Sequence, residues 1–244
     1  MSKLLKLREK AIEAARKAVI ESVSPDLYII NTVNNIEELQ RIINVLTKRL
    51  REWYGLYLPE LDKIIDDNES FASFVAKRTK KALQSEFKIN KTMGADIKQK
   101  DIEPMISMAK TIGSLITQKD FLETYLENTM KEFCPNLFTL AGGTVGAKLL
   151  RGAGSLRKLA MMRSSTIQLL GAEKALFRHI KTGARPPKYG FLMQHNMVQS
   201  AKKQMKGKVA RALADKIFLA ARIDFFQGEF IADELLKGLE VRFK

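Results

Sequence analysis

Two long stretches of the chain repeat apolar side chains at alternating steps of three and four residues, which is the spacing of a coiled coil. The first stretch contains Ile36, Leu39, Ile43, Leu46, Leu50, Trp53 and Tyr57. The second contains Met105, Met108, Ile112, Leu115, Lys119, Leu122, Leu126, Thr129 and Phe133, where only the lysine and the threonine are not apolar. Because two such helices joined by a short connection form an antiparallel hairpin, we predict a long antiparallel coiled coil over residues 25–135.

The apolar seam of such a hairpin has two possible partners. Each helix can bury its seam against the other helix, or the surface left exposed can pair with a second copy of the chain. We expect an intramolecular hairpin that also forms a homodimer, with Trp53 and Tyr54 packing the coiled coil rather than stacking on a nucleobase. The residues assigned to the coiled coil and its dimer are Ile36, Leu39, Ile43, Leu46, Leu50, Trp53, Ile112, Leu115, Leu122 and Leu126.

The segments on either side of the hairpin also read as helical. Residues 1–24 form a leading helix that ends at Ser24, because a proline disfavours helix at the residue before it. After Cys134 and Pro135 the composition changes, and frequent glycines break residues 136–244 into short helices. No convincing alternating strand pattern occurs, so we predict an all-α protein: the hairpin followed by a compact helical C-terminal domain over residues 136–244.

Two stretches of this C-terminal domain are distinctive. Gly183–Gly190, "GARPPKYG", contains two prolines and two glycines and is predicted to be a loop. Gly207–Ile223 is predicted to be an amphipathic helix. Its apolar face contains Val209, Leu213, Ile217 and Ala220.

Charge is distributed unevenly between the two parts of the chain. Residues 1–135 hold 22 basic and 20 acidic side chains, whereas residues 136–244 hold 20 basic and 7 acidic ones. Glu173 is the only acidic residue between Phe133 and Ala214. Such a polycationic region favours a partner made of phosphates, and RNA is the natural candidate, since lysines and arginines release counterions from nucleic acid.

Several other classes of protein fit poorly. No apolar run approaches the roughly 20 residues that a membrane span needs, and no signal peptide is visible, so we expect a cytoplasmic protein. The lone Cys134 excludes an internal disulfide. The glycine-rich stretches lack a phosphate-loop motif, and His179 and His195 lack the neighbours of a metal site. We find no catalytic pair and expect neither enzymatic activity nor a bound cofactor or metal.

Four stretches together resemble one known family. They are "REWYGLYLPELDKII" (Arg51–Ile65), "GSLRKLA" (Gly154–Ala160), "STIQLLGAEKALFRHIKTGARPPKYG" (Ser165–Gly190) and "GKVARALADKIFLAARID" (Gly207–Asp224). They resemble the Nop-domain family, and especially its archaeal Nop5-type members, which are core scaffold proteins of box C/D small ribonucleoproteins. The second, third and fourth stretches all fall within the basic C-terminal domain.

The resemblance implies a coiled coil that mediates homodimerisation and a C-terminal Nop domain that binds kink-turn guide RNA together with an L7Ae-type protein. It further implies a scaffold that organises 2′-O-methylation of RNA by fibrillarin, which uses S-adenosylmethionine. The family's N-terminal fibrillarin-binding domain is not expected here, because the chain starts on the helix before the coiled coil. The alternatives are a spliceosomal-type Nop-domain assembly factor, a coiled-coil adaptor for acidic proteins, or an enzyme with an unrecognised site. The expected location is cytoplasmic in an archaeal cell and nucleolar in a eukaryote.

The same resemblance and the charge pattern indicate the residues that bind RNA or its partner protein. They are Gln168, Gly171, Ala172, Glu173, Lys174, Arg178, Lys181, Arg185, Lys188, Lys208, Arg211, Lys216 and Arg222. Glu173 either compensates a helix dipole or recognises a base edge or a basic partner side chain. Arg211 either pairs with Asp215 one turn on or contacts RNA. The apolar neighbours Leu169, Leu176 and Phe177 are predicted to be core.

Overall fold

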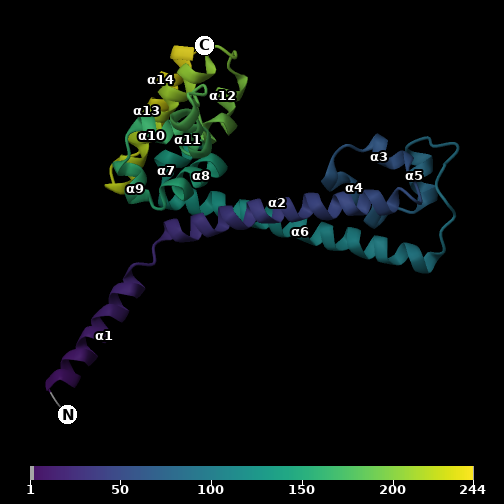
Figure 1. Ribbon diagram of the computed structural model, residues 1–244, viewed down its shortest axis with the longest axis horizontal. Coiled ribbons are helices and arrows are strands. Elements are labelled where there is room, and N and C mark those ends of the chain that lie inside the picture. The colour runs from purple at the N-terminus through teal and green to yellow at the C-terminus, as the bar shows by residue number, and fades with distance from the viewer. Residues whose placement is uncertain (1–2, 244) are drawn as a thin grey trace. The chain divides into compact units, whose positions relative to one another are not determined.

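The computed structural model describes residues 3–243, and every regular element within that range is a helix, so the all-α prediction is confirmed (Figure 1). The chain divides into two compact units. One is Asn34–Thr124, the hairpin unit, and the other combines the segments on either side of it. No helix of the described residues is long and apolar enough to cross a membrane.

The hairpin helices are α2 (Pro25–Tyr54) and α6 (Gln99–Phe133), which lie side by side in Figure 1. In α2 the predicted residues Ile36, Ile43 and Leu50 recur every seven positions and are buried. Thr47 and Tyr54 are buried one residue after the predicted Leu46 and Trp53. Leu39, Gln40 and Leu46 are all partly buried, and Leu46 packs against the core of the hairpin unit, so the prediction for this row is only partly confirmed.

The same displacement occurs in α6. Met105, Ile112 and Leu126 are buried as predicted, together with Lys119. Ala109 and Met130 are buried one residue after the predicted Met108 and Thr129. Leu115 and Ile116 are both partly buried, and Leu122 is partly buried whereas Glu123 after it is exposed. Met108 and Leu115 pack against the core of the hairpin unit, as Leu46 does. The seam therefore contains smaller and more polar side chains than the apolar pattern suggested.

The connection between the two helices is not short, contrary to the prediction. Residues 55–98 contain α3 (Glu60–Ile64), α4 (Asn68–Lys77) and α5 (Lys80–Glu86), followed by a loop. These helices share a core with α2 and α6, which includes Leu58, Leu61, Phe71, Val75 and Leu83. The insertion therefore covers one flank of the hairpin.

Arg51 attaches this insertion to α2. Its guanidinium donates hydrogen bonds to Asp62 at 2.8 Å and Asn68 at 3.1 Å, and it lies 4.3 Å from the centre of the Phe71 ring. A planar guanidinium is suited to such simultaneous contacts, because it offers several donors in fixed directions and a flat face. The arginine that begins the "REWYGLYLPELDKII" stretch is thus structural here.

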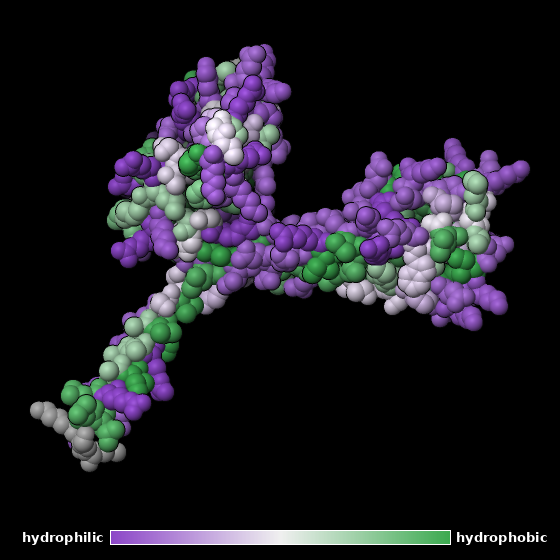
Figure 2. Space-filling view, in the orientation of Figure 1, coloured by the Kyte–Doolittle hydropathy of each residue, from purple (hydrophilic) through white to green (hydrophobic). Residues whose placement is uncertain are grey.

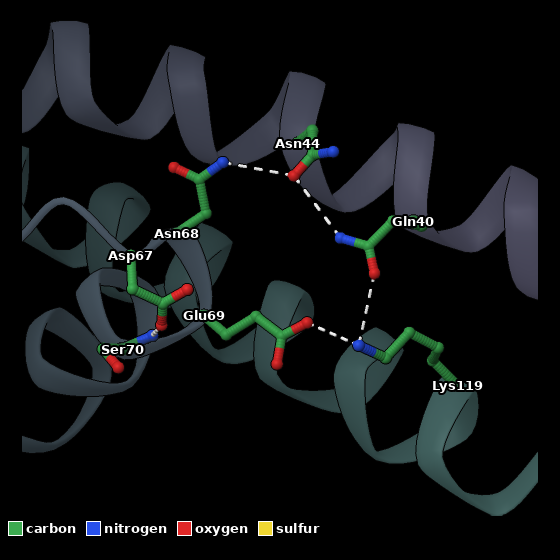
Figure 3. A network of polar contacts seen from close by, with 7 residues as sticks. All are labelled: Gln40, Asn44, Asp67, Asn68, Glu69, Ser70 and Lys119. Carbon is green, nitrogen blue, oxygen red and sulfur yellow. Dashed lines mark hydrogen bonds and ion pairs between the residues drawn. The ribbon is translucent and has the colours of Figure 1, made fainter. Parts of the chain in front are cut away.

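A polar network crosses the seam at Lys119 (Figure 3). The ammonium of Lys119 donates to Glu69 at 2.5 Å and to Gln40 at 3.2 Å, and Gln40 and Asn68 each donate to Asn44. Burial by itself lowers the pKa of Lys119, but the hydrogen bond and charge of Glu69 outweigh it and raise that pKa above its usual value. Since each donor needs its own acceptor, the network favours one register of α2 against α6.

The helices outside the hairpin unit are short, except for α1 and α13. They are α1 (Lys3–Glu21), α7 (Pro135–Ala141), α8 (Gly143–Ala153), α9 (Leu156–Met161), α10 (Ser164–Leu169), α11 (Glu173–Thr182), η1 (Phe191–Gln194), α12 (Asn196–Ser200), α13 (Lys206–Phe225) and α14 (Ala232–Phe243). Helix α13 contacts α7, α9, α10, α12 and α14. Its predicted apolar face, Val209, Leu213, Ile217 and Ala220, is buried, so α13 is the central helix of this unit.

Two carboxylates hold the starts of neighbouring helices in this unit. Asp224, at the end of α13, accepts hydrogen bonds from the backbone N–H of Asn136 at 3.1 Å and of Leu137 at 2.8 Å. Asp26, in the first turn of α2, accepts one from the N–H of Leu156 at 3.0 Å. Burial outweighs these hydrogen bonds at Asp224 and raises the pKa of its carboxyl group. The first turns of α7 and α9 are therefore satisfied by remote acids.

Candidate functional site

The predicted loop Gly183–Gly190 is non-helical and is attached to the end of α10. The side-chain Nε2 of Gln168 donates to the carbonyl of Lys188 at 2.6 Å, and the N–H of Gly190 donates to the carbonyl of Gln168 at 3.0 Å. A Cβ atom at Gly190 would lie 1.9 Å from the carbonyl oxygen of Leu170, so this position requires glycine. These contacts fix the path of the loop and the positions from which its cations project.

The loop, α10 and the first turns of α13 line an open pocket of about 460 Å³, here called the basic pocket. It is lined by Gln168, Arg185, Pro186, Pro187, Lys188, Gln204, Gly207, Lys208 and Arg211. Five of these nine residues were predicted to bind RNA, and they come from three separate segments of the chain. No carboxylate or aromatic side chain lines it. Arg211 forms no ion pair with Asp215 in the described chain, so its basic group is available to a ligand.

The "GAEK" stretch (Gly171–Lys174) forms the tight entry into α11. Gly171 has a φ of +87°, and a Cβ there would lie 2.7 Å from the Phe191 ring, so the turn favours glycine. Glu173 is exposed, and its Oε1 accepts a hydrogen bond from the N–H of Gly171 at 2.7 Å. The carboxylate thus stabilises the turn before α11 through a contact that neither alternative predicted, while dipole compensation and recognition of a partner both stay predictions.

Helix α11 has no buried residue, so the prediction that Phe177 belongs to the core is wrong. Phe177 is 61% exposed and Ile180 is 68% exposed, whereas Leu169 and Leu176 are partly buried. Phe177 follows Leu176 by one residue, which turns it about 100° around the helix and away from the protein body. The apolar spacing alone could not show that α11 packs on a single narrow side.

The remaining predicted cations fall into two groups. Lys174, Arg178 and Lys181 are exposed at steps of four and three on α11, which places them on one side of that helix. Lys216 and Arg222 lie further along α13 and do not line the basic pocket, and the guanidinium of Arg222 lies 5.3 Å from the Phe218 ring centre.

Gln204 lines the basic pocket but was not predicted to be a site residue. Its position in the cation-rich run "KKQMKGK" was the available signal.

Both histidines have structural contacts. Nδ1 of His179 contacts the carbonyl of Ala184, and Nδ1 of His195 accepts a hydrogen bond from the N–H of Met197 at the start of α12. Burial lowers the pKa of His195, against an opposing hydrogen bond to the Leu140 carbonyl. Among residues 3–243, no group of three or more His, Cys, Asp or Glu side chains is placed to hold a metal ion.

Comparison with known proteins gives a consistent result. A family model described as "Nop: snoRNA binding domain, fibrillarin" matches residues 35–244. A NOP5 family protein of Methanocaldococcus jannaschii is 39% identical over 244 aligned positions, covering 93% of this chain and 59% of the relative. Nucleolar protein 58 of Schizosaccharomyces pombe is 38% identical, covering 82% of this chain and 42% of the relative. The chain thus spans about half the length of these relatives.

Nucleolar protein 56 of Homo sapiens is 37% identical, over 82% of this chain and 37% of the relative. A solved structure described as the crystal structure of a fibrillarin/Nop5p complex contains a chain of similar fold. The TM-score is 0.59 and the identity 25%, over 98% of this chain and 77% of that chain. The similarity therefore extends to both the hairpin unit and the region that contains the basic pocket.

Proposed function

This chain belongs to the Nop family, and we propose that it is a non-catalytic scaffold that binds guide RNA in a box C/D-type ribonucleoprotein. The basic pocket is the observation that supports this proposal most strongly. It brings four cations, Arg185, Lys188, Lys208 and Arg211, to one cavity without a neighbouring carboxylate among its lining residues. Such a cluster attracts phosphates and releases counterions when it binds them.

We assign a second role to α11 and its entry turn. Its cations Lys174, Arg178 and Lys181 lie next to the exposed Phe177 and Ile180, so one surface combines charge with apolar area. Phosphate contacts position a protein on RNA but do not specify a sequence. We propose that this surface meets a kink-turn RNA already folded by an L7Ae-type protein, and that Glu173 contributes to the recognition.

We propose that the open flank of the hairpin unit binds a second copy of the chain. The residues that would form this flank are the partly buried or exposed Leu39, Leu46, Trp53, Leu115 and Leu122, together with Ile42. Trp53 is 40% and Ile42 45% exposed, and hydrophobic surface is visible along the hairpin in Figure 2. The insertion α3–α5 covers the opposite flank through Arg51. Burying such a flank is favourable, because apolar area leaves water.

Fibrillarin joins the same assembly in this proposal and carries S-adenosylmethionine, while this chain contributes no catalytic group. The resemblance to a chain solved in a fibrillarin/Nop5p complex supports this partner. The assembly would work in the cytoplasm of an archaeal cell or in the nucleolus of a eukaryote, and the second location is supported by relatives that are named nucleolar proteins.

The proposal is tested by measuring binding to a kink-turn guide RNA across a range of salt concentrations, with and without an L7Ae-type protein. We expect affinity to fall with salt at a log–log slope of about −0.7 to −0.9 per contacted phosphate, and to rise when the small protein is present. Binding to acidic proteins with no dependence on RNA would select the adaptor alternative. Methyl transfer by the isolated chain would show that it is an enzyme.

A further inference from the structure

Gln168 differs from the cations that line the basic pocket, because it is buried and held in one orientation. It is only 9% exposed, whereas Arg185, Lys208 and Arg211 are exposed. Its Nε2 donates to the Lys188 carbonyl at 2.6 Å. Since a carbonyl can only accept, the amide nitrogen must face Lys188, and this determines where the amide oxygen points.

The amide oxygen of Gln168 has no hydrogen-bond donor within the part of the chain that the structure describes. It is also not sealed off from solvent, because the only enclosed side-chain oxygen or nitrogen without a partner in that part of the chain belongs to Thr47. Gln168 lines the basic pocket, and its oriented Oε1 keeps an unused acceptor position that is not fully enclosed. The pocket therefore offers four cationic donors and one fixed neutral acceptor.

The lining of the pocket indicates which part of an RNA would supply the matching donor. Proteins that bind splayed bases usually stack them on aromatic rings, and none lines this pocket. Its cations suit phosphates instead, and its volume of about 460 Å³ falls in the range of roughly 300–1,000 Å³ typical of ligand sites. Along the sugar–phosphate backbone of RNA, the 2′-hydroxyl is the group that can donate a hydrogen bond.

We propose that Gln168 accepts a hydrogen bond from one ribose 2′-hydroxyl while the surrounding cations hold the adjacent phosphates. The basic pocket would then distinguish RNA from DNA without reading the base sequence, which suits a scaffold that serves different guide RNAs. This inference rests on the proposed RNA-binding function. The contacts of Gln168 and Gly190 with the loop keep the acceptor and the loop cations in a constant arrangement.

The test combines changes in the RNA with changes in the protein. The full chain is titrated with a kink-turn guide RNA carrying the L7Ae-type protein, and single 2′-deoxy substitutions are placed along the RNA. For wild type, we expect one position where the substitution weakens binding by about 2- to 12-fold, the worth of one hydrogen bond. For Gln168→Leu, the same substitution should have no effect, because the acceptor is gone.

Gln199→Leu is the matched control. The Nε2 of Gln199 also donates to a backbone carbonyl, that of Gln194, but Gln199 lies outside the basic pocket, so this variant should keep the 2′-hydroxyl sensitivity. A loosened loop in Gln168→Leu would weaken binding to the unmodified and 2′-deoxy RNAs equally, and could not abolish the difference between them. Tight, salt-sensitive binding with no sensitive position in wild type would overturn this inference alone. Absence of any RNA binding would overturn the proposed function as well.

Discussion

The hairpin unit and the basic C-terminal region treat their charges in opposite ways. Within Asn34–Thr124, some of the cations pair with acids of the same unit. The pairs are Arg41–Glu38, Arg49–Glu52, Arg51–Asp62, Arg78–Glu86, Lys80–Asp96 and Lys119–Glu69. In contrast, no Lys or Arg from Arg157 to Arg222 forms an ion pair with a carboxylate in the described chain. Paired charges maintain a shape, whereas unpaired ones remain available to a polyanion.

This contrast predicts that mutations separate into those that change stability and those that change RNA affinity. The largest expected effect on stability is Ile43→Ala in the hairpin seam, where Ile43 is fully buried. It should lower the free energy of unfolding by about 2–5 kcal/mol, because a cavity is added to the lost apolar contact. Urea denaturation measures this, with the 61% exposed Val45→Ala as the control. An equal loss for both variants would contradict the assigned seam.

The polar network at Lys119 gives the next largest effect. Lys119→Met removes the donor that Glu69 and Gln40 share, and should destabilise the hairpin by about 1–3 kcal/mol, since a partly buried carboxylate loses its partner. The double variant Lys119→Met/Glu69→Leu should regain most of this loss in the same denaturation assay. If it is as unstable as the single variant, the unpaired carboxylate is not the cause.

In the basic pocket, in contrast, mutations should change RNA affinity more than they change stability. Arg211→Ala should weaken binding of guide RNA about tenfold, and reduce the salt slope by about 0.7–0.9, while leaving stability within about 0.5 kcal/mol. It should also lower guided methylation in the assembled particle more than it lowers stability. Filter binding at several salt concentrations and thermal denaturation check the two halves of this prediction. Unchanged affinity with lowered stability would place Arg211 among the structural charges.

For Glu173→Ala, the two roles considered for the carboxylate predict different effects on assembly and stability. If Glu173 recognises the kink-turn complex, assembly on that complex should weaken by less than for Arg211→Ala, with little change in melting temperature. If the carboxylate only stabilises the turn at Gly171, the melting temperature should fall and assembly should be unchanged. Native gel shifts and thermal scans of the same preparations separate these outcomes, and Glu173→Gln, which keeps an acceptor oxygen, is the conservative control.

The smallest effect is a pH dependence from His195. Burial lowers its pKa below the usual 6.5, so the folded protein binds this proton less readily than the unfolded chain does. The neutral side chain of His195 therefore contributes fully to the stability of the fold above pH 6.5. This contribution is lost as the pH falls through the lowered pKa of His195 in the folded protein. The difference in stability between wild type and His195→Asn should shrink as pH decreases in this window, as measured by denaturation at each pH. A constant difference would show that protonation of His195 is unlinked to folding.

Sequence patterns predicted the helical class of the protein better than they predicted its packing. The heptad row Ile36, Ile43, Leu50 was correct, because large apolar residues at seven-residue steps face one partner in any register. The burial of Thr47 was missed because threonine is polar, and the contact of Gln40 depends on Lys119, which lies on another helix. That information is tertiary and does not appear in local spacing.

In the candidate site, too, local sequence indicated the residue types but not how they pack. Charge and the resemblance identified five residues of the basic pocket, although α10, the loop and α13 are three separate segments. The burial of Gln168 and the exposure of Phe177 depend on how the loop and α11 pack, so they could not be deduced beforehand. The three-helix insertion was missed because its apolar residues face a core shared by several short helices rather than one regular seam.

The remote acids that start α7 and α9 also determine when this part of the protein can finish folding. The contact of Asp26 with Leu156 spans 130 residues, and that of Asp224 with Leu137 spans 87. Contacts so distant in sequence form slowly, because the loop between them must close first. During synthesis, α7 cannot receive its acid until residue 224 has left the ribosome. The basic C-terminal region is therefore completed late, after the hairpin unit has been translated in full.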